Sequence, residues 1–565
     1  MSSGKPDRPA SWIKDLLILG FVIGLLFSFM LGSRAFWEPD EGRYVEIPRE
    51  MVATGNYVTP RLDGVIYLEK PALFYWLESA SIKLFGLNQW SMRLWPALLG
   101  LFGCLAVYIA GRRLYGRPAG LIAAIVLATD VLYYALARII TIDMPITALL
   151  SISMLAFLLG TREPPGLRRR GLMWAFYAFA ALALLAKGLI GIVFPGMVIG
   201  AWILVRNDWK LLRSIYLPSG LVLLLAIAAP WHILVARANP TFLHYYFIRQ
   251  HFERYLTTVA HRYEPVWFFV PITLAGLYPW TAFLFQALRR SWPASWADRE
   301  QERDALYLVL WAGLILIFFS LSDSKLIPYI LPIFPPLAIL IGRYLAPAWN
   351  GSEVPGMRAG LWVLLAASIA LAVLMVAAPA LTAANPNIGI YVAMLSRYLY
   401  AMAATLAAGS VVALVFAYRR RPLAALVTTA IMGGLFLSIL SSGLPLMNSR
   451  NSVKALAMDL KPLLGPHTEV MNYHAYYQDL PAYIGRTVTI VGFKGELAYG
   501  TTLENDSAWI INDRTFWKRW QSHRTIYMLT TRALYRQLRA GRKGRFRLLA
   551  TSGDNVLLTN TGNRG

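Results

Sequence analysis

Two aspartates lie directly beside strongly apolar stretches of this sequence. Asp40 occurs in Phe36-Trp-Glu-Pro-Asp-Glu-Gly-Arg-Tyr44, after the first apolar run, and Asp143 occurs in Ile139-Ile-Thr-Ile-Asp-Met-Pro145, after the third. A carboxylate at the edge of a membrane span is costly to desolvate, so it usually has a function. We therefore treat both aspartates as candidate catalytic residues that act on a membrane-embedded substrate.

Each aspartate also has a structural explanation. Asp40 could cap a helix or pair with Arg43, and Asp143 could cap the helix that follows it. Against a purely structural role for Asp40, Glu38 and Glu41 bring two further carboxylates into the same short stretch. Their mutual repulsion favours the binding of a cation, an amine or a metal ion. For Asp143 both explanations stay open, because capping a helix does not exclude a function.

A second polar motif, Tyr67-Leu-Glu-Lys-Pro71, combines an acid with a cation. Lys70 could bind a phosphate as a point charge. The alternative is that the Lys70 side chain extends along apolar surface toward the membrane interface. The motif therefore predicts either a phosphate contact or an interfacial anchor.

Further along the chain, Arg249, His251 and Arg254 form a cluster that suits phosphate or carboxylate binding. Glu69 together with His251 could ligate a divalent metal ion, although two ligands do not make a site. Tyr329 follows another polar junction, Ser322-Asp-Ser-Lys, for which headgroup anchoring is the competing explanation. The residues suggest no cofactor other than this possible divalent metal ion, and they do not firmly imply the metal ion either.

The composition is that of a polytopic membrane protein. Of 565 residues, 57% are hydrophobic and 15% are charged, and the mean hydropathy is +0.49. The net charge of +24 is concentrated in short loops, where it orients helices and contacts anionic lipid headgroups. We therefore expect membrane lipids as partners, and no nucleic acid.

A membrane span needs about 20 apolar residues. Thirteen segments qualify: 15–33, 94–113, 118–136, 144–160, 172–187, 189–205, 215–236, 266–288, 305–321, 327–346, 358–379, 398–418 and 423–443. With a cytoplasmic N-terminus, the short arginine-rich loops all fall on the inside, as the positive-inside rule requires. The long segments 34–93 and 237–265 then lie outside with both aspartates, and we expect short interfacial helices in them, in 34–93 at 41–54 and 72–85.

The composition changes after residue 443. Strand-like runs at 469–471, 487–491, 525–529 and 555–558 alternate with helix-like stretches at 452–463, 513–521 and 530–540. We therefore predict a transmembrane catalytic domain over 1–443, with the outer loops 34–93 and 237–265, and a small α/β domain over 444–565. The sequence contains no Gly-rich phosphate loop, no Walker motif and no nucleophile elbow. It therefore gives no support for ATP-driven chemistry or serine hydrolysis.

Five motifs resemble those of the bacterial aminoarabinose transferases of lipid A, in the expected order through most of residues 12–345. They are Glu38-Pro-Asp-Glu-Gly-Arg-Tyr-Val-Glu-Ile-Pro-Arg-Glu-Met51, Tyr67-Leu-Glu-Lys-Pro71, Ile142-Asp-Met-Pro145, Lys187-Gly-Leu-Ile-Gly191 and Ser324-Lys-Leu-Ile-Pro-Tyr-Ile-Leu-Pro332. The resemblance extends to the protein mannosyltransferase-like superfamily and implies the glycosyltransferase C fold, with about thirteen transmembrane helices, interfacial periplasmic helices and a periplasmic C-terminal domain.

The resemblance implies transfer of 4-amino-4-deoxy-L-arabinose from undecaprenyl phosphate to a lipid A phosphate, at the periplasmic face of the bacterial inner membrane, and hence polymyxin resistance. It maps the two acidic residues of the family to Asp40 and Asp143. We expect these two aspartates to position sugar and acceptor, and a role of either one as a base stays open. The remaining predicted substrate-binding residues are Glu41, Tyr44, Tyr67, Lys70, Arg249, Arg254 and Tyr329. Lys70 and the two arginines suit the departing lipid phosphate. We expect a monomer.

Two other functions stay open at this point. The same fold could use another sugar or acceptor, as in a protein mannosyltransferase. A lipid transporter would instead place its polar residues near the midplane, often in repeated halves. No internal repeat is evident in this sequence, and the polar clusters are predicted on one face, which favours the transferase.

Overall fold

The computed structural model describes residues 11–253, 255, 263–541 and 544–561. Contacts divide the chain into two compact units, each built from segments that are distant in sequence. The helical unit comprises Met1–Leu31, Trp95–Ile233 and Leu243–Gly443, and the mixed unit comprises Gly32–Leu94, Leu234–Phe242 and Leu444–Gly565. The first long loop of the sequence is thus part of the same unit as the C-terminal region.

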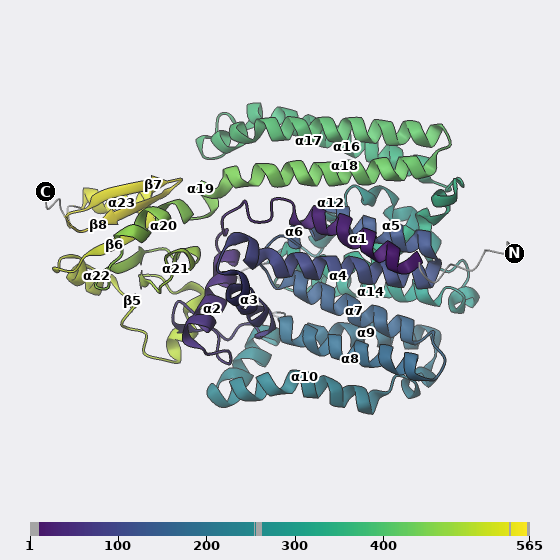
Figure 1. Ribbon diagram of the computed structural model, residues 1–565, viewed down its shortest axis with the longest axis horizontal. Helices are drawn as coiled ribbons and strands as arrows, with labels where there is room; N and C mark the ends of the chain where they lie inside the picture. The colour runs from purple at the N-terminus through teal and green to yellow at the C-terminus, as the bar shows by residue number, and fades with distance from the viewer. Residues whose placement is uncertain (1–10, 254, 256–262, 542–543, 562–565) are drawn as a thin grey trace. The chain divides into compact units, whose positions relative to one another are not determined.

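Long apolar helices make up the helical unit (Figure 1). Its α-helices, two of which extend into the mixed unit, are α1 Ser11–Ser28, α4 Gln89–Tyr115, α5 Arg117–Thr129, α6 Val131–Leu136, α7 Asp143–Gly160, α8 Leu167–Lys187, α9 Ile190–Arg206, α10 Leu217–Ala238, α12 Phe269–Gly276, α13 Leu284–Ser291, α14 Arg303–Leu321, α15 Phe334–Leu345, α16 Met357–Thr382, α17 Pro386–Tyr418 and α18 Pro422–Gly443. Shorter turns of other helix types are η1 Trp209–Arg213, the π-helix η2 His244–Glu253, η4 Trp280–Phe283, η5 Trp296–Glu300, η6 Ile327–Ile333 and η7 Ala346–Asn350. In Figure 1, α16, α17 and α18 run side by side, and α17 packs against both neighbours.

Helix occupies each of the thirteen segments that the sequence predicts as spans. Within the described residues, nine helices are long and apolar enough to cross a membrane, and Arg117–Thr129 and Ile190–Arg206 are shorter apolar helices. The multi-pass helical architecture is confirmed, although several predicted spans are interrupted.

The boundaries between helices and the interruptions within predicted spans have local causes. Between α8 and α9 the chain turns at Gly188, whose φ of 100° is accessible to glycine at little cost. Asp130 separates α5 from α6 because its side chain accepts a 2.7 Å hydrogen bond from the Tyr133 amide and so starts a new helix. The predicted span 266–288 ends its first helix before Pro279, which has no amide hydrogen to continue it.

The mixed unit contains helices, a two-stranded hairpin and a six-stranded sheet. Its first segment contains α2 Asp40–Thr54, β1 Arg61–Leu62, β2 Val65–Ile66 and α3 Leu73–Phe85. Its C-terminal segment contains η8 Leu444–Met447, α19 Asn448–Asn451, α20 Lys454–Leu460, η9 Lys461–Leu463, β3 Glu469–Tyr473, α21 Asp479–Ile484, β4 Thr489–Val491, η10 Gly495–Leu497, η11 Gly500–Thr502, β5 Ile510–Ile511, α22 Asp513–Trp520, β6 Ile526–Thr531, α23 Arg532–Ala540, β7 Arg547–Ser552 and β8 Asn555–Thr559. The predicted helices at 41–54 and 72–85 and the predicted α/β character after residue 443 are confirmed.

The six-stranded sheet has the order β5-β4-β3-β6-β8-β7. The first four strands are parallel, and β8 and β7 complete the sheet as an antiparallel hairpin. That hairpin turns through Gly553, whose φ of 54° suits a two-residue turn. In an open parallel sheet, ligands bind beyond the carboxyl ends of the strands, so the loops after β3 and β4 are candidate functional positions.

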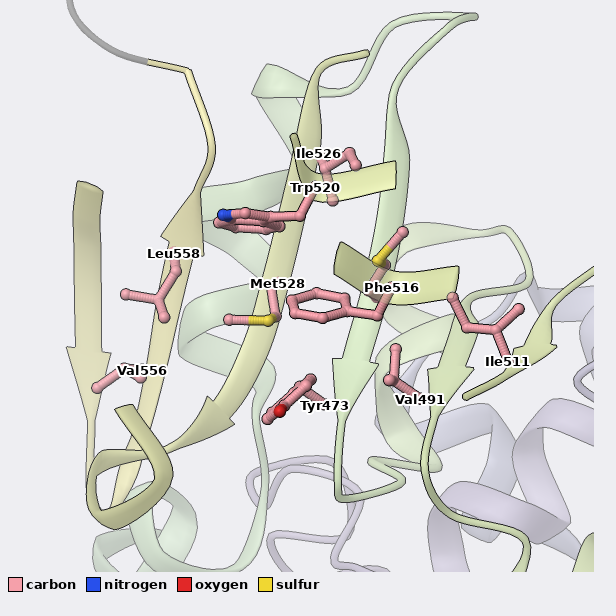
Figure 2. Packing of buried hydrophobic residues seen from close by; sticks show 10 residues of the cluster. Tyr473, Val491, Ile511, Phe516, Trp520, Ile526, Met528, Val556 and Leu558 are labelled. Carbon is pink, nitrogen blue, oxygen red and sulfur yellow. The ribbon is translucent and has the colours of Figure 1, made fainter. Parts of the chain in front are cut away.

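One face of the sheet is covered by α22. Figure 2 shows the rings of Phe516 and Trp520 among side chains from five strands, including Met528 of β6. Both aromatic side chains are buried, because successive turns of α22 place them on the same side of the helix. This packing forms the core of the mixed unit on that face.

Candidate functional site

Asp40 is the first residue of α2 and lies on the surface of the mixed unit. Its side chain is 59% exposed, whereas Glu41 and Arg43 in the same turn are buried. The two acids stand in the first turn of the helix, where the partial positive charge of the amide groups stabilises them. The fold therefore holds the charged neighbours inside and leaves the Asp40 carboxylate accessible.

Glu41 anchors the start of α2. Its two carboxylate oxygens accept hydrogen bonds from the guanidinium of Arg34 at 2.7 and 2.8 Å and from that of Arg93 at 3.0 and 2.8 Å. A fifth hydrogen bond, 2.9 Å long, comes from the Trp37 amide. Burial alone would raise the pKa of Glu41, but the two guanidinium groups outweigh it and lower that pKa to about 2.

Glu38 joins the same segment to the C-terminal part of the mixed unit. Its carboxyl oxygens accept hydrogen bonds from the backbone amides of Gln478, at 3.0 Å, and of Asp479, where α21 begins. Burial and the neighbouring Asp479 carboxylate raise the pKa of Glu38 well above its usual value. Burial raises the pKa of Asp479 as well, so this pair of buried carboxyl groups disfavours carrying two charges.

Arg43 lies at the centre of a polar network around Asp40. Its guanidinium is 3.3 Å from the Asp40 carboxylate and 3.4 Å from that of Glu496. It also donates hydrogen bonds to Gln478 Oε1 at 3.1 Å and to the Tyr67 hydroxyl at 3.5 Å. Residues of the C-terminal α/β region thus orient the side chain that pairs with Asp40.

The other predicted residues of the mixed unit lie near this network or in the core beside it. The Tyr67 hydroxyl donates a 3.0 Å hydrogen bond to Glu69 Oε2. Tyr44 is buried between Phe74 and Tyr75 of α3, with ring centroids 5.9 and 6.0 Å away. Lys70 is half-buried directly after this tyrosine–glutamate pair. Their roles toward a substrate stay predictions.

Asp143 lies in the helical unit as the first residue of α7. Its carboxylate forms an ion pair with Lys187, the last residue of the adjacent helix α8, and both side chains are largely buried. The ammonium nitrogen of Lys187 lies 4.6 Å from the centre of the Tyr329 ring. The antiparallel helices α7 and α8, together with η6, therefore bring an acid, a cation and a predicted substrate-binding tyrosine together.

The remaining predictions fall on or near the π-helix η2. The exposed Arg249 has its guanidinium carbon 5.9 Å from the Tyr245 ring. Arg254 and the side chain of His251 lie outside the described residues, so the proposed Glu69–His251 metal site stays a prediction. Within the part of the chain that the structure describes, no group of three or more His, Cys, Asp or Glu side chains could hold a metal ion.

Sequence reasoning missed some of these contacts. Arg43 was considered only as a partner of Asp40, and Gln478 and Glu496 carried no signal because single polar residues in loops are common. Lys187 had a weak signal, its position at the end of a predicted span. The pairing of Lys187 with Asp143 could have been inferred from topology. Asp143 begins the preceding predicted span, and both residues are predicted at the same membrane face.

Two segments of the chain match models of known protein families. The family model of dolichyl-phosphate-mannose-protein mannosyltransferases matches residues 12–246, and the model of the aminoarabinose transferase C-terminal domain matches residues 456–560. The two segments contain Asp40 and Asp143 in the first, and Gln478 and Glu496 in the second.

Related sequences are named undecaprenyl phosphate-alpha-4-amino-4-deoxy-L-arabinose arabinosyl transferases. The protein of Enterobacter sp. (strain 638) is 32% identical over 64% of this chain and 65% of its own length. That of Aeromonas salmonicida (strain A449) is 33% identical over 65% of this chain and 66% of its own length. The chain thus matches slightly less than two thirds of the length of these relatives.

A solved structure covers nearly the whole chain. The crystal structure of ArnT from Cupriavidus metallidurans bound to undecaprenyl phosphate is 29% identical, with a TM-score of 0.83 over 98% of this chain and 99% of that one. The apo structure of the same protein gives a TM-score of 0.84. Together with the apolar helices, this likeness identifies a multi-pass membrane protein.

Proposed function

We propose that this chain, with its glycosyltransferase C fold, belongs to the aminoarabinose transferase family and transfers 4-amino-4-deoxy-L-arabinose from undecaprenyl phosphate to a phosphate of lipid A. The proposal places it in the bacterial inner membrane, with Asp40 and the C-terminal region on the periplasmic side, as a monomer. The added amino sugar lowers the negative charge of lipid A and so weakens the binding of cationic peptides such as polymyxin.

In the proposed reaction an oxygen of the lipid A phosphate bonds to the anomeric carbon of the sugar. The bond from that carbon to undecaprenyl phosphate breaks, and the lipid phosphate leaves with the bonding electrons. The acceptor phosphate is already an anion near neutral pH, so it needs little help from a general base. Catalysis then depends on stabilising positive charge on the sugar and negative charge on the leaving phosphate.

The Asp40 carboxylate suits the first of these tasks. It is exposed, whereas Glu41 and Arg43 in the same turn are buried and paired inside the fold. An accessible carboxylate can face both the ammonium group of the sugar and the positive charge that develops at its anomeric carbon. This contrast is the observation that carries the proposal.

Cations suit the second task. Lys70, Arg249 and Arg254 supply positive charge that can bind the undecaprenyl phosphate as it leaves. Asp143 is held by Lys187, so we assign it the placing of sugar or acceptor through a fixed carboxylate. Glu41 is buried under two arginines, and we assign it the positioning of Asp40 rather than direct contact with substrate.

Mass spectrometry of lipid A tests the proposal. A transferase-deficient Gram-negative strain with a confirmed donor pool receives this protein, its Asp40→Asn variant or the control Asp459→Asn, which changes an exposed aspartate of α20. A mass gain of one aminoarabinose with the unaltered protein and the control, but not with Asp40→Asn, is expected. Modification by all three proteins would overturn the role of Asp40. No gain with any of them would indicate another sugar or acceptor.

A further inference from the structure

The mixed unit contains a pocket that lies away from the Asp40 network. It has a volume of about 530 Å³ and opens where the parallel strands begin. Its wall includes Glu469 and Thr489, the first residues of β3 and β4, and Arg524, which precedes β6. Two partners of Arg43 lie instead beyond the other ends of these strands: Gln478 follows β3 and Glu496 follows β4. Since β3 has five residues, the two sites are separated by a strand length of about 16 Å.

The pocket carries a surplus of positive charge. Glu469 Oε1 already accepts hydrogen bonds from Arg519 at 2.6 Å and from Thr489 at 2.9 Å. The Arg524 guanidinium is 3.8 Å from Glu469 Oε2, beyond hydrogen-bond distance, and its side chain is 65% exposed. Arg524 lines the pocket and therefore has N–H donors left for a ligand, and the paired Glu469 offsets only part of the positive charge.

Arg486 adds a second guanidinium to the wall and is held in place. It donates hydrogen bonds to the carbonyl oxygens of Thr468, at 2.7 Å, and Gly465, at 3.3 Å. A guanidinium has five donors in a fixed plane, so two such bonds leave others for a ligand. The exposed His467 lies on the same loop and lines the pocket as well. Two arginines and a histidine around one cavity match the geometry of phosphate and carboxylate groups.

An aromatic side chain completes the wall. Trp509 is half-buried and packs against Gly64, where an added Cβ would meet the indole ring at 3.3 Å. Its indole nitrogen is buried and makes no hydrogen bond within the described residues, and the same holds for Glu469 Oε2. A flat apolar ring beside charged groups suits a ligand with both hydroxyl groups and an apolar face.

We infer that this pocket binds an anionic saccharide, that is, a sugar carrying phosphate or carboxylate substituents. Because the pocket and Asp40 are a strand length apart, the bound sugar is not the one being transferred. Its source is the acceptor, whose acidic sugars beyond the reacting phosphate occupy the pocket during transfer. The source rests on the proposed function, whereas the binding of an anionic sugar by the pocket does not.

Binding to the full-length protein in detergent provides the first test. The probes are glucose 6-phosphate and glucose, measured by calorimetry with the unaltered protein, Arg524→Ala, Arg524→Lys and a control, Arg536→Ala, at an exposed arginine of α23. We expect glucose 6-phosphate to bind at least tenfold more tightly than glucose, with about a tenfold loss in Arg524→Ala and a smaller loss in Arg524→Lys. Equal binding of the two sugars, or an equal loss in Arg536→Ala, would overturn the site.

Transfer assays provide the second test and identify the source. With an acceptor that carries acidic sugars, Arg524→Ala should raise KM about tenfold and leave kcat unchanged. With lipid A that lacks those sugars, the variant and the unaltered protein should give the same KM. A KM that does not depend on the acidic sugars would overturn the acceptor as the source. If the unaltered protein modifies neither acceptor, the proposed function fails, and the binding experiment alone decides the pocket.

Discussion

Replacing Glu41 by glutamine tests whether the buried ion-pair cluster holds the candidate catalytic segment. Glu41 is 1% exposed and accepts hydrogen bonds from Arg34, Arg93 and the Trp37 amide. Glutamine keeps the shape of the side chain but removes the charge and turns one acceptor into a donor. Removing one partner of a buried ion pair costs about 3–5 kcal/mol, because the remaining charge is left uncompensated.

The pKa of Glu41 gives a second measure of the same interaction. The pKa is about 2 in the folded protein and about 4.3 in an unfolded chain, and the difference corresponds to about 3 kcal/mol. Because the folded pKa is depressed, this stability is fully present above pH ~4.3 and is lost as the pH falls toward 2. The two estimates agree, so we expect a loss of about 3 kcal/mol in Glu41→Gln at pH 7 and a smaller loss at pH 3.

Hydrogen exchange of the peptide that contains Trp37 reports this loss, since the Trp37 amide donates to Glu41. A matched control is Glu504→Gln, which removes the partner of Arg61 from an ion pair whose glutamate is 40% exposed. Exposed pairs are worth about 0–1 kcal/mol, so the control should leave exchange nearly unchanged. Equal exchange in the two variants would refute the reasoning, as would a Glu41→Gln effect that is the same at pH 7 and pH 3.

Three further perturbations test other parts of the molecule. Arg43→Lys removes the planar guanidinium that links Asp40 to the C-terminal loops. The kcat for transfer should fall about 10–100-fold while thermal unfolding changes little, and an unchanged kcat would refute this positioning role. Phe516→Ala opens a cavity in the core of Figure 2 and should cost the mixed unit about 3–5 kcal/mol, measured by hydrogen exchange of β6, and unchanged protection would contradict that packing. Ser507→Cys places a thiol on an exposed loop, whereas the native Cys104 is buried. A membrane-impermeant maleimide should therefore label the variant in cells with a permeabilised outer membrane. Labelling only after the inner membrane is opened would contradict the proposed orientation.

The strongest periodic signals in the sequence predicted the elements that position the candidate site. The segment 41–54 alternates acids and apolar residues at helical spacing, and α2 runs over Asp40–Thr54. By contrast, β7 at Arg547–Ser552 was not predicted. It is an edge strand with exposed residues at both faces, so it lacks the alternation that marks a half-buried strand. Likewise, β5 has only two residues, too few to produce a pattern.

The candidate site was predictable only in its local part. The carboxylate of Asp40 was identified because it borders an apolar run, which is a property of neighbouring residues. The Arg43–Gln478 hydrogen bond joins residues 435 positions apart, and no local pattern encodes it. Such a contact depends on how the first loop and the C-terminal region fold into one unit. The C-terminal region was expected to form a separate domain, and that expectation gave no reason to search it for partners of Asp40.

The two aspartates differ in how much of their charge the protein itself balances. Asp143 is largely buried and paired with Lys187, so its charge is compensated and its position is fixed. Asp40 is exposed, and its ion pair with Arg43 is longer, at 3.3 Å, with a guanidinium that Glu496 also contacts. A carboxylate that shares its counter-ion with another carboxylate is less fully neutralised, so it attracts a bound cation more strongly. This difference supports the proposed roles, in which Asp40 meets the positive charge of the sugar and Asp143 defines where the reacting groups lie.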